Sequence, residues 1–114
     1  MHELSIAMSI VDMAEEEAAR QGGRIAAVHL KLGALSGVAK DALLSCYGMA
    51  CENTSLAGSR LVVEEIPTAV YCERCQDRRE LLSGHFFCCP VCGCPASNIV
   101  QGKELEVFAL EIEE

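Results

Sequence analysis

The sequence is poor in aromatic residues. Its 114 residues include no Trp, two Tyr and three Phe, whereas 51% of the chain is hydrophobic. A core built from this composition must therefore be aliphatic. No apolar run approaches the roughly 18 residues that a membrane-spanning helix needs, so we expect no membrane span.

Basic residues are also scarce. Lys and Arg number 9 against 17 Asp and Glu, which gives a net charge of −8. Binding one Zn²⁺ (+2) as four thiolates (−4) would change −8 to −10. Such a chain repels phosphate backbones, so we expect protein or metal partners and no nucleic acid. Arg74, Arg78 and Arg79 form a small basic cluster, which we interpret as pairing with nearby acids.

Catalytic motifs are absent from the sequence. It contains no Gly-x-Ser-x-Gly, no glycine-rich phosphate loop and no evident pairing of a nucleophile with a base. We therefore expect a protein that is not an enzyme.

Two Cys-x-x-Cys pairs, Cys72/Cys75 and Cys89/Cys92, dominate the second half of the chain. Facing pairs of this kind form a four-sulfur cage that suits structural zinc. A disulfide framework needs a secreted chain, and we read no signal peptide at the start of the sequence. Thioredoxin-type chemistry uses one pair, not two. A rubredoxin-like iron site stays open as a minor alternative to zinc.

Other candidate ligands lie close to the two pairs. Cys88 and Cys94 flank the second pair as spare thiols, so a slipped register in which Cys88 binds with Cys92 stays open. His85 lies between the pairs, and an auxiliary metal role stays open for it. Free thiols beside a thiolate site indicate a reducing compartment, most simply the cytoplasm.

Hydrophobic periodicity predicts an α/β (α+β) fold with two helices on a small three-stranded mixed sheet. Residues 1–66 plus 104–114 should form the α/β domain, with residues 67–103 inserted as a zinc-ribbon-like module that holds its metal with four cysteines. The last strand changes phase at Phe108–Ala109, which suggests a bulge or twist. The expected elements are a helix over 4–21, a strand over 24–35, a helix over 38–53, and strands over 60–66 and 103–114.

The first three residues, Met1, His2 and Glu3, form a second candidate metal site. The α-amine of Met1, the backbone nitrogen of His2 and its Nδ1 can close adjacent chelate rings. The amide nitrogen or the carboxylate of Glu3 could complete the coordination. Deprotonated amides in a square plane suit Ni(II) or Cu(II) better than zinc.

These motifs together resemble the HypA/HybF family of nickel metallochaperones for [NiFe]-hydrogenase maturation. The resemblance rests on the opening Met-His-Glu-Leu-Ser, on Leu-Lys-Leu-Gly-Ala-Leu-Ser at residues 30–36, and on the two cysteine pairs. The ending Leu-Glu-Val…Leu-Glu-Ile-Glu at residues 105–113 extends it over nearly the whole chain. Cys88 and Cys94 are not part of the family pattern.

The resemblance implies a role for each site. Met1, His2 and Glu3 would bind Ni²⁺ as transient cargo, and Cys72, Cys75, Cys89 and Cys92 would hold structural Zn²⁺. It also implies a HypB-type GTPase as partner and delivery of nickel to the hydrogenase large subunit, and some relatives serve urease maturation. The competing hypothesis is a zinc-ribbon module that binds protein or nucleic acid and has no nickel role.

Overall fold

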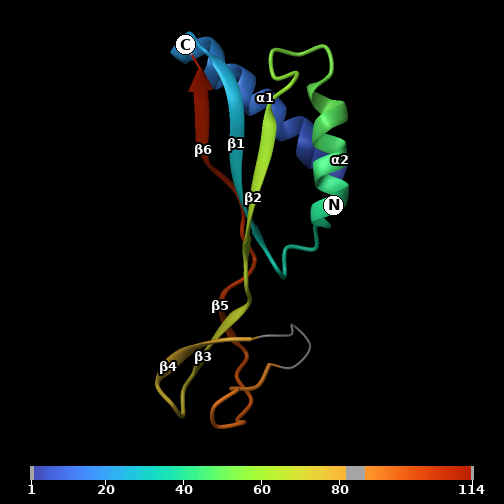
Figure 1. Cartoon of the computed structure of the whole chain (residues 1–114). Coiled ribbons are helices and arrows are strands. Elements are labelled where there is room, and N and C mark those ends of the chain that lie inside the picture. Colours follow the sequence, from blue (N-terminus) through green and yellow to red (C-terminus); the bar gives the residue numbers. More distant parts are fainter. Residues whose placement is uncertain (1, 82–86, 114) are drawn as a thin grey trace. The chain divides into compact units, whose positions relative to one another are not determined.

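The structure, a computed structural model, describes residues 2–81 and 87–113 (Figure 1). The first four elements are α1 (Glu3–Gln21), β1 (Arg24–Gly33), α2 (Lys40–Cys51) and β2 (Arg60–Ile66). They are followed by β3 (Ala69–Cys72), β4 (Asp77–Glu80), β5 (Asn98–Gln101) and β6 (Leu105–Glu113). The fold is α+β, as predicted, with two helices and two small sheets.

The chain divides into two compact units, which we call the α/β unit and the cysteine unit. The α/β unit comprises Met1–Lys31, Gly37–Glu64 and Glu106–Glu114, and the cysteine unit comprises Leu32–Ser36 and Glu65–Leu105. The cysteine unit thus includes more than residues 67–103, because Leu32–Ser36 bonds to its backbone. Within it, Ala34 N–H donates to Ile66 C=O at 2.9 Å and Leu35 N–H to Gly102 C=O at 2.6 Å.

Helix α1 forms because its apolar residues recur at helical spacing and bury one face. The buried side chains are Ile6, Ala7, Ile10, Val11, Ala14 and Ala18. The helix ends at Gly22, whose φ of 78° is left-handed and whose N–H donates to Ala18 C=O at 2.9 Å. A glycine adopts this conformation without a Cβ penalty, so the predicted stop is also the observed one.

The sheet of the α/β unit has the order β2-β1-β6. In Figure 1, β1 and β2 run in the same direction and β6 runs in the opposite one, so the sheet is mixed as predicted. The central strand supplies much of the aliphatic core, including Ile25, Val28 and Leu30, each at most 1% exposed. Helix α1 passes behind the strands in this view, and it packs against α2.

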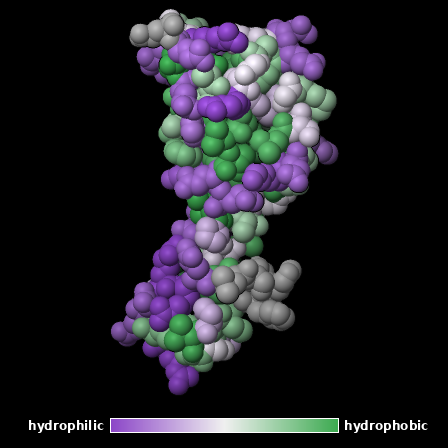
Figure 2. All heavy atoms as spheres, viewed as in Figure 1, coloured by the Kyte–Doolittle hydropathy of each residue, from purple (hydrophilic) through white to green (hydrophobic). Residues whose placement is uncertain are grey.

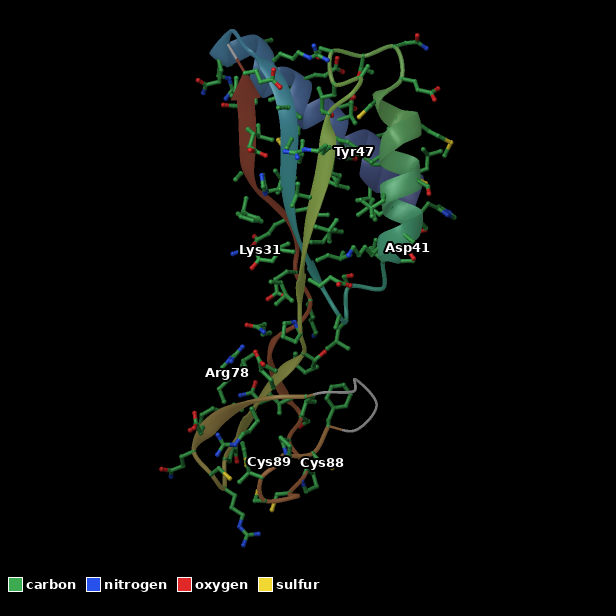
Figure 3. All side chains as sticks on the ribbon, viewed as in Figure 1. Lys31, Asp41, Tyr47, Arg78, Cys88 and Cys89 are labelled. Carbon is green, nitrogen blue, oxygen red and sulfur yellow. The ribbon has the colours of Figure 1, made fainter. Side chains whose placement is uncertain are left out.

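Helix α2 is joined to the segment before β2 by part-buried polar contacts. Tyr47 lies between α2 and β2 in Figure 3, and its hydroxyl is 2.7 Å from Ser59 Oγ. Burial raises the pKa of Tyr47 to about 12. Cys51, 3% exposed, packs here as a small apolar residue, whereas Cys46 is only partly buried.

Strand β6 is continuous over its nine residues. Its half-buried positions are Leu105 and Val107 and then Leu110, with Phe108 and Ala109 both exposed between them. The burial alternation therefore changes phase at the step where the sequence predicted it. None of the helices within residues 2–81 and 87–113 combines the length and the apolar character needed to cross a membrane.

The cysteine unit contains a second sheet, β4-β3-β5, which is antiparallel throughout. Cys72 pairs with Asp77 across β3 and β4, so the first cysteine pair lies at the turn that joins these strands. The apolar cluster of this unit is small: Val70, Leu81 and Ala96, with Ile99 packed against them. So little burial leaves the unit dependent on another source of stability.

Candidate metal sites

The four cysteines of the two Cys-x-x-Cys pairs converge in the cysteine unit. Their sulfur atoms all lie within 4.8 Å of one another. Cys72 Sγ is 3.5 Å from Cys92 Sγ, and Cys75 Sγ is 3.8 Å from Cys89 Sγ. Four sulfurs bound at ~2.3 Å in a tetrahedron around one zinc ion are ~3.8 Å apart. The cage therefore has the dimensions of a zinc tetrathiolate.

Backbone N–H groups point at two of the sulfurs. Cys75 N–H donates to Cys72 Sγ at 3.4 Å, and Cys92 N–H donates to Cys89 Sγ at 3.5 Å. The latter contact lowers the pKa of the Cys89 thiol to about 6. Cys94 N–H acts on Cys92 in the same direction, yet burial and the other sulfurs raise the pKa of Cys92 to about 12. A bound divalent cation would displace the protons that these sulfurs otherwise hold.

The two cysteine turns share one backbone feature. Gly93 follows the second pair with φ of 78°, and Gln76 follows the first pair with φ of 54°. Both residues are thus left-handed, the conformation that lets the chain fold back after each pair. Glycine favours this conformation, so Gly93 could have been predicted, whereas Gln76 was missed because glutamine gives no such signal. Aligning the two pairs with each other would have found it.

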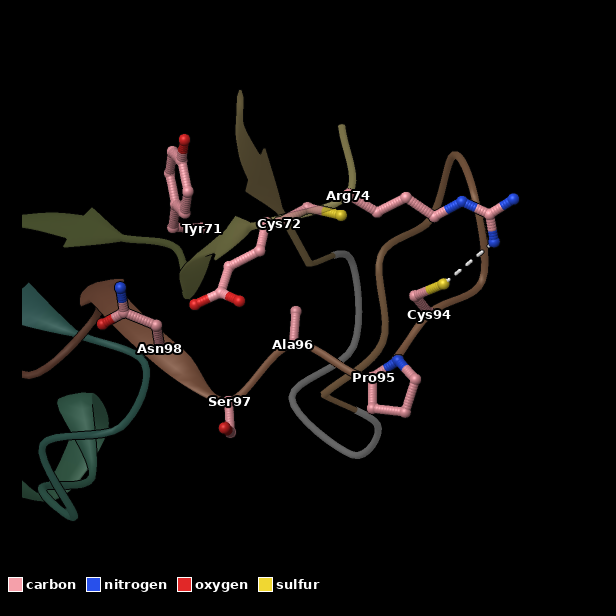
Figure 4. Close-up of a pocket in the computed structure, with 9 residues that line it drawn as sticks. Tyr71, Cys72, Arg74, Cys94, Pro95, Ala96, Ser97 and Asn98 are labelled. Atoms are coloured by element: carbon pink, nitrogen blue, oxygen red, sulfur yellow. Dashed lines mark hydrogen bonds between the residues drawn. The ribbon is translucent and has the colours of Figure 1, made fainter. Parts of the chain in front are cut away.

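Cys94 is not part of the cage and contacts a basic residue. Arg74 Nη1 donates to Cys94 Sγ at 3.3 Å, and this hydrogen bond lowers the pKa of the Cys94 thiol (Figure 4). Both residues line a polar cavity of about 520 Å³ with Tyr71, Glu73 and Asn98. Cys88 is exposed, and its backbone bridges to Pro95. The four converging sulfurs are thus those of the unslipped register.

The other two arginines of the basic cluster pair with acids, as the sequence predicted. Arg79 Nη1 is 2.8 Å from Asp77 Oδ2, and Arg78 Nη2 is 3.8 Å from Glu80 Oε1. The bond with Asp77 and then contacts with Cys75 and Cys89 raise the pKa of Arg79. Its positive charge therefore faces the sulfur cage as well as Asp77. His85 lies outside the described residues.

The second candidate site is at the start of α1. Met1 lies outside the described residues, and His2 is the exposed N-cap residue with extended backbone angles (φ −88°, ψ 132°). The His2 side chain makes no capping hydrogen bond, while its C=O accepts from Ile6 N–H at 3.2 Å. The imidazole is therefore not committed to holding the helix.

Glu3 connects this site to α2. Its Oε2 accepts a hydrogen bond from Ala39 N–H at 3.2 Å, and Ala39 is the N-cap residue of α2. This bond is the largest cause that lowers the pKa of Glu3. Sequence reasoning did not find the contact, because nothing in a local pattern joins residues so distant along the chain.

The chain is similar to known proteins over its whole length. A family model described as hydrogenase/urease nickel incorporation, metallochaperone, matches residues 1–112. The hydrogenase maturation factor HypA of Roseiflexus sp. (strain RS-1) is 50% identical over 115 residues, covering 100% of this chain and 94% of that protein. The chain belongs to the HypA family.

Further relatives in this family match the chain over nearly its whole length. The HypA of Chloroflexus aurantiacus is 49% identical, and the HybF of Klebsiella pneumoniae is 39% identical; each alignment covers 97% of this chain and 98% of the relative. The family is one of nickel metallochaperones for hydrogenase maturation and not of catalysts.

Solved structures share the fold. The solution structure of the Ni metallochaperone HypA from Helicobacter pylori aligns with a TM-score of 0.66 at 23% identity, covering 98% of this chain and 97% of that one. A second solution structure of a HypA protein aligns with a TM-score of 0.72, also at 23% identity, covering 99% and 97%. At this identity the likeness concerns the fold.

Proposed function

We propose that this protein carries Ni(II) at its N-terminal end for hydrogenase maturation, and that zinc stabilises its cysteine unit. Met1, His2 and Glu3 form the nickel site, and Cys72, Cys75, Cys89 and Cys92 bind zinc. The observation that carries the proposal is the state of His2, which is exposed and uncommitted at the start of α1.

The start of a helix is a suitable place for amide ligands. The first four N–H groups of an α-helix have no acceptor within the helix. Glu3 is the first residue of α1, so its amide can turn to a metal without breaking the helix. Nickel bound through the Met1 amine, the His2 amide and the His2 imidazole takes the Glu3 amide as the adjacent donor in the chain.

The Glu3 carboxylate has a different task in this scheme. Its Oε2 accepts the N–H of Ala39, which holds the carboxylate toward the start of α2. We therefore assign the nickel-ligand role to the Glu3 amide, with the carboxylate holding α2 beside the site. Acid reverses such binding, since protonation of the amide nitrogens competes with the metal. A cargo site of this kind can thus release its ion when a partner protein changes its surroundings.

The cysteine cage suits a structural ion. Two of its residues, Cys72 and Cys89, are at most 2% exposed, which leaves little access for a transient cargo. Zinc bound there by four thiolates would add folding free energy to a unit whose apolar cluster is small. Arg79 partly offsets the negative charge of the thiolates.

The same function implies partners and a compartment. We propose that a HypB-type GTPase is a partner of this protein and that the hydrogenase large subunit receives its nickel. Urease maturation proteins are further proposed partners. The cysteines outside the cage, such as Cys51 and Cys94, form no disulfide bonds, which fits a reducing cytoplasm.

The experiment that tests the nickel site is a Ni(II) titration of the zinc-loaded protein with its native N-terminus. We expect one Ni(II) per chain, lost in His2→Ala while zinc stays bound. His29→Ala is the matched control, since His29 lies in β1 and bonds to Glu111 at 3.0 Å. Acetylation of the Met1 α-amine removes that donor and should also weaken binding. Unchanged affinity in His2→Ala would overturn the proposed site.

A further inference from the structure

Strand β6 forms an open edge of the α/β unit. In the order β2-β1-β6 it has β1 on one side, and among the described residues no strand pairs with its other side. It is nine residues long, from Leu105 to Glu113. An edge strand presents unpaired N–H and C=O groups along its length and is a template for another extended chain.

A groove runs beside this edge. It has a volume of about 400 Å³, and it is lined by Met13, Glu17 and Gln21 of α1 and by residues 107–110 and Ile112 of β6. Met13 is 39% exposed, Phe108 47% and Ile112 38%. These apolar side chains let the groove accept the alternate side chains of an added strand. The apolar patch that Figure 2 shows on this unit lies between β2 and α2, away from the groove.

The charges of β6 select the occupant. The strand carries three glutamates, Glu106, Glu111 and Glu113, and no Lys or Arg. Glu111 is committed to His29 and Arg60, at 3.0 and 3.1 Å. Within the part of the chain that the structure describes, Glu106 and Glu113 have no ion-pair partner and are exposed. A second copy of this chain, with the same net charge of −8, would bring like charges together.

We propose that β6 is the docking site for an extended, positively charged segment of a partner protein. The segment pairs with the outer edge of β6 as a fourth strand. Its alternate apolar side chains enter the groove against Met13 and Ile112, while its Lys or Arg side chains face Glu106 and Glu113. Main-chain bonds supply affinity in this mode, and the groove and charges supply specificity. The site uses no metal ligand, so it does not depend on the nickel proposal.

The test uses the full chain, zinc-loaded, and a capped synthetic peptide of the length of β6 in which Val and Lys alternate. Saturable binding should perturb the backbone NMR signals of β6 and slow hydrogen exchange at alternate β6 amides. A peptide N-methylated at alternate residues, which cannot bond along one edge, should bind about tenfold more weakly. A peptide with Glu in place of Lys should lose at least as much affinity.

Two matched variants locate the groove. Met13→Ala should weaken binding of the Val–Lys peptide several-fold, whereas Met49→Ala should leave it unchanged, because Met49 is exposed on α2 outside the groove. The double variant Glu106→Lys with Glu113→Lys should reverse the preference between the Lys and Glu peptides.

Three results would overturn the proposal. The first is absence of binding at millimolar peptide, and the second is equal affinity for the parent and N-methylated peptides. The third is self-association, seen as β6 shifts that grow with protein concentration and a doubled mass in sedimentation.

Discussion

The two units of this protein reach stability by different means. The α/β unit buries a continuous aliphatic core, in which Val28, Leu43 and Leu56 are fully buried. The cysteine unit has a small apolar cluster and a cage of four converging sulfurs. One unit is therefore stabilised by removing apolar surface from water, and the other by closing a metal site.

The difference also separates the two proposed metals. The cage is closed and partly buried, with sulfur donors fixed by backbone N–H groups. The chain end at His2 is exposed, and its nitrogen donors are held only by the start of a helix. A closed site suits an ion that stays, and an exposed one suits an ion that leaves. Changes to one unit should therefore leave the other unit folded.

Removal of zinc should have the largest effect and unfold the cysteine unit alone. Structural zinc contributes on the order of 10–16 kcal/mol in finger peptides, far more than the burial around Val70 can replace. With a chelator, or in Cys89→Ser, amides of β3 and β5 should exchange rapidly while those of β1 stay protected. Cys88→Ser is the control and should keep zinc and protection. If the amides of β1 lost their protection from exchange together with those of β3, the two units would not be stabilised separately.

Truncation of the aliphatic core should destabilise the α/β unit and leave the cysteine unit folded. Leu30→Ala removes a side chain that is 1% exposed in the α/β unit, and it should cost about 2–5 kcal/mol of unfolding free energy. Urea unfolding followed by β1 amide signals measures this loss. Zinc content should not change. A variant that released zinc without lowering the stability of β1 would show that the core had been assigned to the wrong unit.

The two cysteine turns should respond oppositely to glycine and alanine. Gly93→Ala places a Cβ at φ of 78° and should cost about 1–2 kcal/mol. Gln76→Gly relieves the same strain at φ of 54°, and after the entropy of the added glycine it should be neutral or stabilising by about 1 kcal/mol. Competition for zinc with a chromophoric chelator would report both changes. If Gln76→Gly destabilised the protein as much as Gly93→Ala, the two turns would not share a strained left-handed position.

The smallest effect concerns pH and Glu3. Ala39 N–H holds the pKa of Glu3 below its unfolded value, so the contact stabilises the α/β unit above the unfolded pKa. This contribution is lost as pH falls through the lower, folded pKa. Glu3→Gln should therefore be slightly less stable than the parent at neutral pH and equal to it in acid. Glu52→Gln, at an exposed residue, is the control. A stability difference that persisted in acid would rule out the carboxylate as its source.

Much of this architecture could be predicted from local patterns. The apolar stripe ending at Gly22 predicted α1, and the two-residue spacing within each cysteine pair predicted the cage. Such features depend on residues a few positions apart, where the geometry of a helix or a turn is nearly fixed.

The remaining features depend on contacts between distant segments. Arg74 reaches Cys94, and Glu3 reaches Ala39, only once the intervening chain has folded. A side chain on Gly33 would collide with the carbonyl of Gly102, a close approach that explains why strand 24–33 joins the cysteine unit at its end. Neither residue type nor spacing predicts a contact between segments so far apart in the sequence. The predicted boundaries at 67 and 103 therefore lay inside the observed unit.

X-ray absorption at the nickel and zinc edges of one sample, loaded with one ion of each metal, tests the separation of the two sites most directly. We predict only nitrogen and oxygen around nickel, and four sulfurs at ~2.3 Å around zinc. Sulfur in the nickel shell, with zinc displaced to nitrogen or oxygen ligands, would place the cargo in the cysteine cage and contradict that separation.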